Sequence, residues 1–294
     1  MSRETLTHDG TSGRAIRLAD GRRLSLARPL IMGTLNVTPD SFSDGGRHTS
    51  RSMAIGRALE MEGEGADIID VGGESTRPGA APVDVDEEMR RVLPVIEGIR
   101  KASDIPISID TYKAITAKAA LDAGADIIND VSGLRFDEEM AGLVAARGVP
   151  VVIMHMKGTP RDMQKNPRYD DCLAEITAFF RERIVHAERQ GIAPAQIIID
   201  PGIGFGKRLE DNLEILANLG RFRDLGFPLL VGPSRKRFIA MIHPSSKPAD
   251  QRLGGSIAAV VAAALGGADI VRVHDIDQTM EALRVAQALR GAVR

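Results

Sequence analysis

Three short acceptor side chains stand where apolar runs of the sequence end. Asp110, Asn129 and Asp200 each close a run rich in isoleucine or valine. A carboxylate can accept two parallel N–H bonds from a planar, amidine-like edge, as it does from arginine. If the three side chains meet in space, they can hold a flat heterocycle that is rich in hydrogen-bond donors.

Basic side chains close two other apolar runs. Lys236 follows residues 228–234, and Arg272 and His274 lie two residues apart within residues 269–275. Side chains two apart on a strand share a face, so Arg272 and His274 can point into the same site. Such groups suit an anionic partner, a phosphate or a carboxylate. Each polar residue could instead be a satisfied core group or a helix cap, and only their convergence favours a site.

Two long polar loops follow the first two apolar runs. Residues 35–46 contain an amide, hydroxyls, carboxylates and the single aromatic Phe42, and residues 72–80 are also rich in small, polar and turn residues. Such mixtures pack poorly and suit a mobile cover over a ligand. The alternative is a pair of solvated loops with ordinary turn chemistry.

A third loop, at residues 202–207, contains three glycines and ends in lysine. It lacks the glycine spacing and the following serine or threonine of a phosphate-binding P-loop. We interpret it as flexible backbone between a strand and a helix rather than as a phosphate cradle.

Eight apolar runs of strand length alternate with amphipathic stretches of helical period. The runs are residues 30–37, 67–73, 106–111, 126–131, 150–156, 196–202, 228–234 and 269–275. The predicted helices are residues 52–65, 85–101, 113–124, 137–148, 171–191, 209–226, 256–267 and 276–292. Eight such units predict an α/β fold, a (βα)8 TIM barrel, which would bring all the polar strand ends to one face.

The ends of the elements support this repeat. Gly-Ala-Asp recurs at residues 65–67, 124–126 and 267–269, where a glycine C-cap would precede each strand. Residues 15–18 and 23–26 flank Asp20-Gly21, which predicts a hairpin that plugs the bottom of the barrel. Ser256 fits the N-cap of an apolar helix that we expect to be buried.

The composition is that of an ordinary globular protein. A net charge of −2, with eight Phe, two Tyr and no Trp, argues against a nucleic-acid surface of basic patches and stacking platforms. The single cysteine, Cys172, excludes an internal disulfide framework. We see no signal peptide and no apolar run of membrane-spanning length, and expect a cytoplasmic protein without membrane partners. We predict a flexible N-terminus at residues 1–13 and a single domain over residues 14–294.

Four segments resemble the signatures of the dihydropteroate synthase family. They are Asn-Val-Thr-Pro-Asp-Ser-Phe-Ser-Asp-Gly-Gly at 36–46, Asp-Val-Gly-Gly-Glu-Ser-Thr-Arg-Pro-Gly at 70–79, Asp-Pro-Gly-Ile-Gly-Phe-Gly-Lys at 200–207 and Ser-Arg-Lys at 234–236. The resemblance extends from about residue 14 to the end of the chain. It implies a pterin-binding barrel that joins 6-hydroxymethyl-7,8-dihydropterin pyrophosphate to 4-aminobenzoate in folate biosynthesis. It also implies a Mg²⁺ cofactor and a homodimer.

The resemblance assigns roles residue by residue. The residues that would hold the pterin are Asp110, Asn129, Asp200, Lys236 and Met154, the last by packing on the ring. Those that would hold the pyrophosphate are Asn36, Arg272 and His274, and Asn36 would also bind the Mg²⁺. Those around the aminobenzoate would be Phe42, Thr76, Pro78, Phe205 and, at its carboxylate, Ser234, with Asp44 and Arg77 ordering the loops. The charged members, Asp110, Asp200, Lys236, Arg272 and His274, would carry the catalysis.

Two other functions are compatible with parts of this pattern. A pterin-dependent methyltransferase shares the barrel and the acidic pterin contacts, but needs neither a pyrophosphate site nor the Ser-Arg-Lys triplet. A barrel that binds pterin without catalysis would not need Asp200, Lys236 and Arg272 together with both loops.

Overall fold

Eight parallel strands form the central sheet of the computed structural model, which describes residues 13–38, 47–75, 80–243 and 248–292. They are β3 (Leu30–Asn36), β4 (Ile68–Gly72), β5 (Ile107–Asp110), β6 (Ile127–Asp130), β7 (Val151–Met154), β8 (Ile197–Asp200), β9 (Leu230–Val231) and β10 (Ile270–Val273). Their order in space is β8, β7, β6, β5, β4, β3, β10, β9, and a bridge between Ile199 and Leu229 joins the two ends. The predicted barrel is confirmed.

The strand that departs most from its prediction is β9. Only Leu230 and Val231 pair with β10, whereas residues 228–234 were expected to form the strand. Gly232 and Pro233 follow directly, and a proline has no N–H to donate to the next strand.

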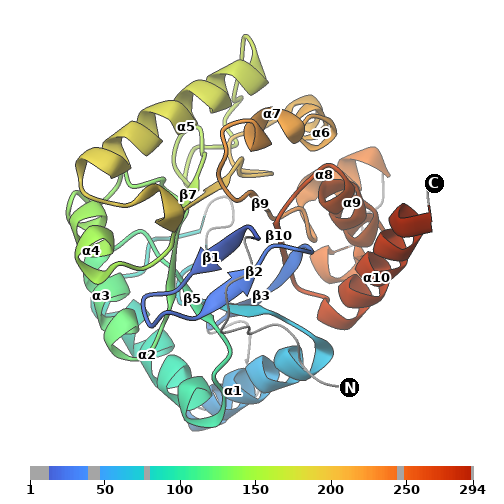
Figure 1. Cartoon of the computed structure of the whole chain (residues 1–294). Coiled ribbons are helices and arrows are strands. Elements are labelled where there is room, and N and C mark those ends of the chain that lie inside the picture. The colour runs from blue at the N-terminus through green and yellow to red at the C-terminus, as the bar shows by residue number, and fades with distance from the viewer. Residues whose placement is uncertain (1–12, 39–46, 76–79, 244–247, 293–294) are drawn as a thin grey trace.

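Helices surround the barrel (Figure 1). They are α1 (Arg47–Glu64), α2 (Val85–Ala102), α3 (Ala114–Asp122), α4 (Glu139–Arg147), α5 (Cys172–Arg189), α6 (Leu209–Ala217), α7 (Gly220–Arg223), α8 (Arg237–Ile242), α9 (Leu253–Leu265) and α10 (Ile276–Ala292). Short 3₁₀ turns precede β8 at Pro194–Gln196 and α9 at Ala249–Gln251. The sequence did not predict α8 as a helix. It also predicted one helix over residues 209–226, where the structure has a break between α6 and α7.

The prediction for α9 was wrong in two respects. The helix begins at Leu253, so Ser256 lies inside it and is not its N-cap; the Ser256 hydroxyl donates to Arg252 O (2.8 Å) and accepts from Arg235 N (2.9 Å). The helix is also not wholly buried, because Leu253 is 38% exposed and Leu265 50% exposed. One apolar face of α9 therefore meets solvent in the single chain.

A hairpin of β1 (Ala15–Arg17) and β2 (Arg23–Ser25) lies across one end of the barrel (Figure 1). Its side chains Ile16, Leu18 and Leu24 are buried. They pack on inward-facing residues at the starts of the strands, which are Leu30, Met32, Ile68, Ile127, Val152, Ile198, Leu230 and Ile270. The predicted plug at the bottom of the barrel is confirmed.

The Gly-Ala-Asp repeats do more than end helices. Their glycines have the positive φ expected of a C-cap, such as 107° at Gly65. Their aspartates fasten the N-terminal segment to the barrel. The Asp67 carboxylate accepts hydrogen bonds from both terminal nitrogens of Arg28 (2.7 and 2.8 Å) and from a β3 backbone N–H. The Asp269 carboxylate accepts hydrogen bonds from both terminal nitrogens of Arg14 (2.8 and 3.0 Å) and from the backbone N–H of a residue before β9.

The third aspartate of the repeat, Asp126, follows the same rule. It accepts from Arg22 of the hairpin turn, from Arg100 of α2 (2.7 Å) and from the first backbone N–H of β5 (2.9 Å). Arginine side chains and backbone N–H groups thus donate hydrogen bonds to every carboxylate of the repeat.

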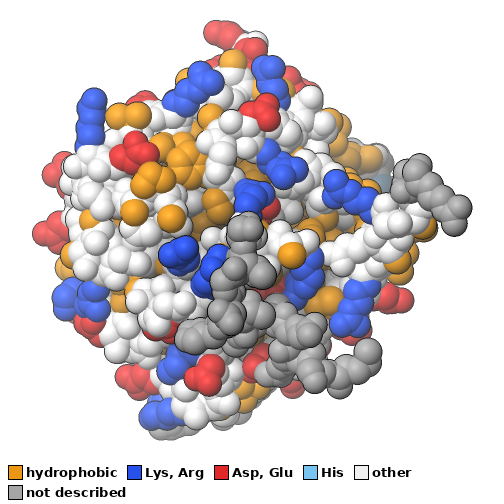
Figure 2. All heavy atoms as spheres, viewed as in Figure 1, with side chains coloured by type: hydrophobic (Ala, Val, Ile, Leu, Met, Phe, Trp, Pro, Cys, Tyr) orange, Lys and Arg blue, Asp and Glu red, His pale blue; other side chains and the backbone are white. Residues whose placement is uncertain are grey.

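The face of the molecule that holds the hairpin carries mixed charge. Figure 2 shows the face that holds the hairpin, where the described basic and acidic side chains are scattered among neutral and apolar ones. None of the helices in the described ranges is both long and apolar enough to cross a membrane.

Candidate active site

Polar side chains occupy the inward positions in the upper half of the barrel. Asp70 of β4, Asp110 of β5, Asn129 of β6 and Asp200 of β8 are all at most 6% exposed. Arg272 of β10 reaches into the same space with 18% of its side chain exposed. In four of these strands, the polar residue comes two positions after an apolar residue that also points into the barrel. In β5, Asp110 instead comes two positions after the inward-pointing Ser108.

Arg272 links two of the buried carboxylates. Its Nε donates to Asp70 Oδ2 at 2.6 Å and its Nη2 to Asp110 Oδ2 at 2.8 Å. Asn129 Nδ2 donates to the same Asp70 oxygen at 3.1 Å. Asp70 therefore fixes one residue predicted for the pyrophosphate and one predicted for the pterin.

Burial shifts the protonation of the two aspartates predicted to bind pterin. It raises the pKa of Asp110 to about 7, with Arg272 opposing the shift and the charge of Asp70 adding to it. It raises the pKa of Asp200 to about 6, opposed by a hydrogen bond from Gly202 N and by the charge of Lys236. A ligand with N–H donors would lower both pKa values, because it would stabilise the ionised carboxylates.

An apolar wall stands beside these acceptors. Met154 and Phe205 are buried in a small cluster with Val131, Met156 and Met163. The Nζ atom of Lys236 lies 4.2 Å from the centroid of the Phe205 ring. A flat ring held by Asp200 would thus have sulfur and aromatic surface on one side and a cation at its edge.

The glycine loop after β8 packs closely against the segment after β7; its predicted flexibility stays a prediction. A Cβ atom at Gly202 would lie 2.1 Å from His155 O, and one at Gly206 would lie 2.2 Å from Lys157 O. Glycine is required at both positions because the backbones approach so closely.

Lys207, the last residue of this loop, is buried. Its Nζ lies 3.0 Å from His155 Nδ1 and donates to Phe205 O at 3.0 Å. Burial lowers the pKa of Lys207 to about 7. Lys207 therefore ties the loop that carries Phe205 to the strand end that carries Met154.

The cationic side of the barrel mouth is built by β10 and the segment after β9. His274 Nδ1 lies 3.1 Å from the hydroxyl of Ser234, which is 4% exposed. Arg235, next to Ser234, has a left-handed φ of 59° and binds Asp275 through both Nε (3.1 Å) and Nη2. Asn36 ends the neighbouring strand β3 and is half-buried.

Comparisons with known proteins fit this site. A model of the pterin binding enzyme family matches residues 32–274. The dihydropteroate synthase of Escherichia coli K12 is 48% identical over 93% of this chain and 96% of its own length. This chain belongs to the dihydropteroate synthase family.

Solved structures of dihydropteroate synthases share its fold. That of Xanthomonas albilineans with 4-aminobenzoic acid has a TM-score of 0.89 and 49% identity, covering 95% of this chain and all of that one. A complex of dihydropteroate synthase from the same organism with 7,8-dihydropteroate has a TM-score of 0.85 and 46% identity, with the same coverage.

The structure brings together the residues that the sequence predicted at the strand ends. Asp110, Asn129 and Arg272 are joined through hydrogen bonds, and Lys236 lies close enough to Asp110 and Asp200 to affect their ionisation. Five residues predicted in the covering loops lie outside the described residues: Phe42, Asp44, Thr76, Arg77 and Pro78.

Two residues of the site had no predicted role. Asp70 sits within an apolar strand and opens the segment at 70–79 that resembles the family, but the resemblance assigned it no role. Lys207 was seen only as the end of a glycine loop. Both act through contacts with residues distant in the sequence; Asp70 and Arg272, for example, are 202 positions apart.

Proposed function

We propose that this dihydropteroate synthase joins 6-hydroxymethyl-7,8-dihydropterin pyrophosphate to 4-aminobenzoate and releases 7,8-dihydropteroate and pyrophosphate. The observation that carries the proposal is the shared barrel mouth, where the buried acceptors Asp110, Asn129 and Asp200 face the cations Arg272 and Lys236. The reaction breaks a carbon–oxygen bond to pyrophosphate and forms a carbon–nitrogen bond. It therefore needs both a ring site and an anion site.

The acceptors hold the pterin. Asp200 accepts two N–H bonds from the aminopyrimidine edge, since a carboxylate matches such a fork of donors. Asp110 and Asn129 bind the other polar edge atoms, Lys236 binds a ring acceptor, and Met154 packs on the ring face. The buried position of these groups makes each ring donor costly to leave unpaired.

The cations hold the pyrophosphate. Arg272 and His274 neutralise its charge, and the Ser234 hydroxyl, 3.1 Å from His274 Nδ1, orients that imidazole. Asp70 positions Arg272, so the Arg272 guanidinium already lies at the barrel mouth before the substrate binds. The predicted contact of Ser234 with the aminobenzoate carboxylate stays a prediction.

The proposal includes a Mg²⁺ ion that binds together with the pyrophosphate. The ion commonly takes one or two protein ligands and completes its octahedron with substrate phosphates and water. Asn36 offers one neutral oxygen at the end of β3, beside β10, and this donor fits an ion that arrives with its anion. When bound, Mg²⁺ adds to the neutralisation of the leaving group.

The chemistry then depends on positioning and electrostatics. Once its charge is neutralised, pyrophosphate leaves readily, and the electron-rich pterin spreads the positive charge that develops on the methylene carbon. The weakly basic amine of 4-aminobenzoate attacks that carbon and loses a proton, so no strong general base is required. The loops that contain Phe42 and Thr76 exclude water, which would otherwise capture the carbon.

The direct test is pyrophosphate release from the pterin substrate with Mg²⁺, measured with and without 4-aminobenzoate. Release that depends on 4-aminobenzoate and yields dihydropteroate is expected. Methyl transfer from methyltetrahydrofolate would instead support the methyltransferase alternative. Tight pterin binding with no turnover would show a non-catalytic barrel.

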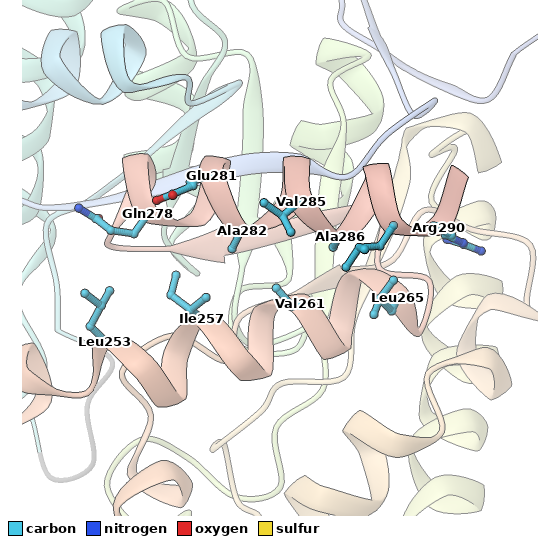
Figure 3. A pocket seen from close by; sticks show the side chains of 11 residues that line it. Leu253, Ile257, Val261, Leu265, Gln278, Glu281, Ala282, Val285, Ala286 and Arg290 are labelled. Carbon is cyan, nitrogen blue, oxygen red and sulfur yellow. The ribbon is translucent and has the colours of Figure 1, made fainter. Parts of the chain in front are cut away.

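A homodimer is the second part of the proposal. An apolar groove of about 740 Å³ runs between α9 and α10, where Leu253, Ile257 and Val261 face Ala282 and Val285 (Figure 3). Its floor is apolar, and the polar Gln278, Glu281 and Arg290 lie among its lining residues. A second copy that presents the same face would cover it, as the isologous interfaces of symmetric dimers do.

Light scattering of paired variants tests the dimer. Val285 of α10 and Ile115 of α3 are each 56% exposed, but only Val285 lines the groove. We expect Val285→Glu to give a monomer and Ile115→Glu to leave the dimer intact. A wild-type monomer at micromolar concentration would contradict the proposal. The cytoplasmic location, and the absence of nucleic-acid and membrane partners, stay predictions.

A further inference from the structure

Three buried oxygen atoms lie beneath the site without a hydrogen-bond partner among the described residues. They are Thr34 Oγ1, Asp70 Oδ1 and Ser108 Oγ. Asp70 and Ser108 are fully buried and Thr34 is 6% exposed. A polar atom that is buried and unpaired is costly, so native structures pair nearly all of them with protein or ordered water.

The three residues are neighbours across adjacent strands. Thr34 of β3 is in register with Asp70 of β4, and Asp70 is in register with Ser108 of β5. In-register side chains on parallel neighbours point to the same side, about 4.8 Å apart. Asp70 contacts Arg272 inside the barrel, so all three side chains point into the barrel at one level.

The three oxygens are left with hydrogen bonds that a bridging group can supply. None of the three atoms forms a hydrogen bond with another or with any other group in the described ranges. Polar atoms that face one another beyond direct contact are commonly joined by water. Two hydroxyls and a carboxylate oxygen also match what a buried water needs, which is about three hydrogen bonds.

We propose that Thr34, Asp70 and Ser108 hold one ordered water molecule below the active site. The water donates to Asp70 Oδ1 and forms its other hydrogen bonds with the hydroxyls of Thr34 and Ser108. A metal cation is disfavoured, since the other Asp70 oxygen already accepts from the cationic Arg272.

This water makes Asp70 a positioning residue for both halves of the site. Asp70 Oδ2 accepts from Arg272 Nε at 2.6 Å and from Asn129 Nδ2 at 3.1 Å. With Oδ1 held by the water, the carboxylate cannot rotate away from these two donors. The effect on catalysis rests on the proposed function; the water site itself does not.

A crystal structure of the wild-type protein at about 1.5 Å resolution or better tests the site directly, with a second crystal soaked in rubidium chloride. We expect one peak within hydrogen-bond distance of all three oxygens, about 2.6–3.2 Å, without rubidium anomalous signal. An anomalous peak there would overturn the proposal in favour of a cation site. Direct bonds among the three residues with no peak would overturn it entirely.

Variants then test the positioning role. Thr34→Val removes one hydroxyl and keeps the shape of the side chain, whereas Thr34→Ser keeps the hydroxyl and is the matched control. We expect Thr34→Val and Ser108→Ala to lose the water peak and to raise the KM for the pterin pyrophosphate by about tenfold. The KM for 4-aminobenzoate should change much less, and Thr34→Ser should resemble wild type in both.

Failure of the positioning role and failure of the proposed function would give different results. A lower melting temperature with both KM values unchanged would show a water that is merely structural and would overturn the positioning role. If the wild-type protein had no synthase activity, the proposed function would fail, but the crystal structure would still decide the water site.

Discussion

Both ends of the barrel pair aspartate with arginine, but they use the pair differently. At the bottom, Asp67, Asp126 and Asp269 each accept hydrogen bonds on both carboxylate oxygens, from arginine side chains and from a backbone N–H. At the top, Asp70 has one oxygen without a partner in the described part of the chain, and Arg272 is shared between two carboxylates.

The difference separates stability from function. A carboxylate whose oxygens are all satisfied stabilises the fold and has nothing left to offer a ligand. Asp110 and Asp200 instead have pKa values raised by burial to about 7 and about 6. Shifted pKa values among polar groups that converge on one place are typical of binding and catalytic sites.

Replacing the shared arginine should have the largest effect. Arg272→Lys keeps a positive charge but loses the guanidinium that donates to both Asp70 and Asp110 and that we propose to bind the pyrophosphate. We expect kcat/KM for the pterin pyrophosphate to fall by about 10² or more, as measured by steady-state kinetics. Kinetics close to wild type would show that Arg272 has no part in the reaction.

Changing the pH should have a smaller effect, with opposite signs for binding and for stability. In the proposed function, ionised Asp110 and Asp200 accept the ring N–H groups, so calorimetry should show that pterin affinity falls by about tenfold or more between pH 8 and pH 5. The folded pKa values lie above the unfolded value. The contribution of these carboxyls to stability is therefore greatest below the unfolded pKa and is lost as the pH rises through 6 to 7.

The variant Asp110→Asn sharpens this prediction. It removes the group with the higher pKa, so the dependence of pterin affinity on pH should weaken above pH 6. An affinity that stays constant from pH 5 to pH 8 in the wild-type protein would contradict the role of both carboxylates.

The same substitution at the bottom of the barrel should have the smallest effect. Arg28→Lys also breaks a two-nitrogen pair, with Asp67, but the Arg28 side chain is 34% exposed. We expect a loss of unfolding free energy of about 1 kcal/mol or less, measured by denaturant titration, and unchanged kinetics. A fall in kcat/KM comparable with that of Arg272→Lys would remove the distinction between the two ends.

The sequence predicted the barrel and the top of the site for the same physical reason. Parallel strands buried on both faces are almost wholly apolar, so a polar residue such as Asp110 or Asp200 at a strand end is conspicuous. The hairpin was predictable because Asp20-Gly21 between two short apolar segments is a local signal.

What the sequence missed depends on contacts between distant segments. Asp70 looks like one polar residue in a strand until Arg272 is placed beside it. The aspartates of the Gly-Ala-Asp repeat gave no sign of their arginines, because Arg14 and Asp269 are 255 positions apart. β9 ends early because Pro233, which has no N–H to donate, follows it closely, and apolar periodicity does not report such a break.

The most direct test of the contrast between the two ends compares Asp200→Asn with Asp269→Asn by calorimetry with a pterin ligand and by thermal unfolding. We predict that Asp200→Asn weakens pterin binding by about 2–5 kcal/mol without lowering the melting temperature. Asp269→Asn should lower the melting temperature and leave pterin affinity unchanged. Normal pterin binding by Asp200→Asn, or equal losses of affinity in both variants, would contradict the account.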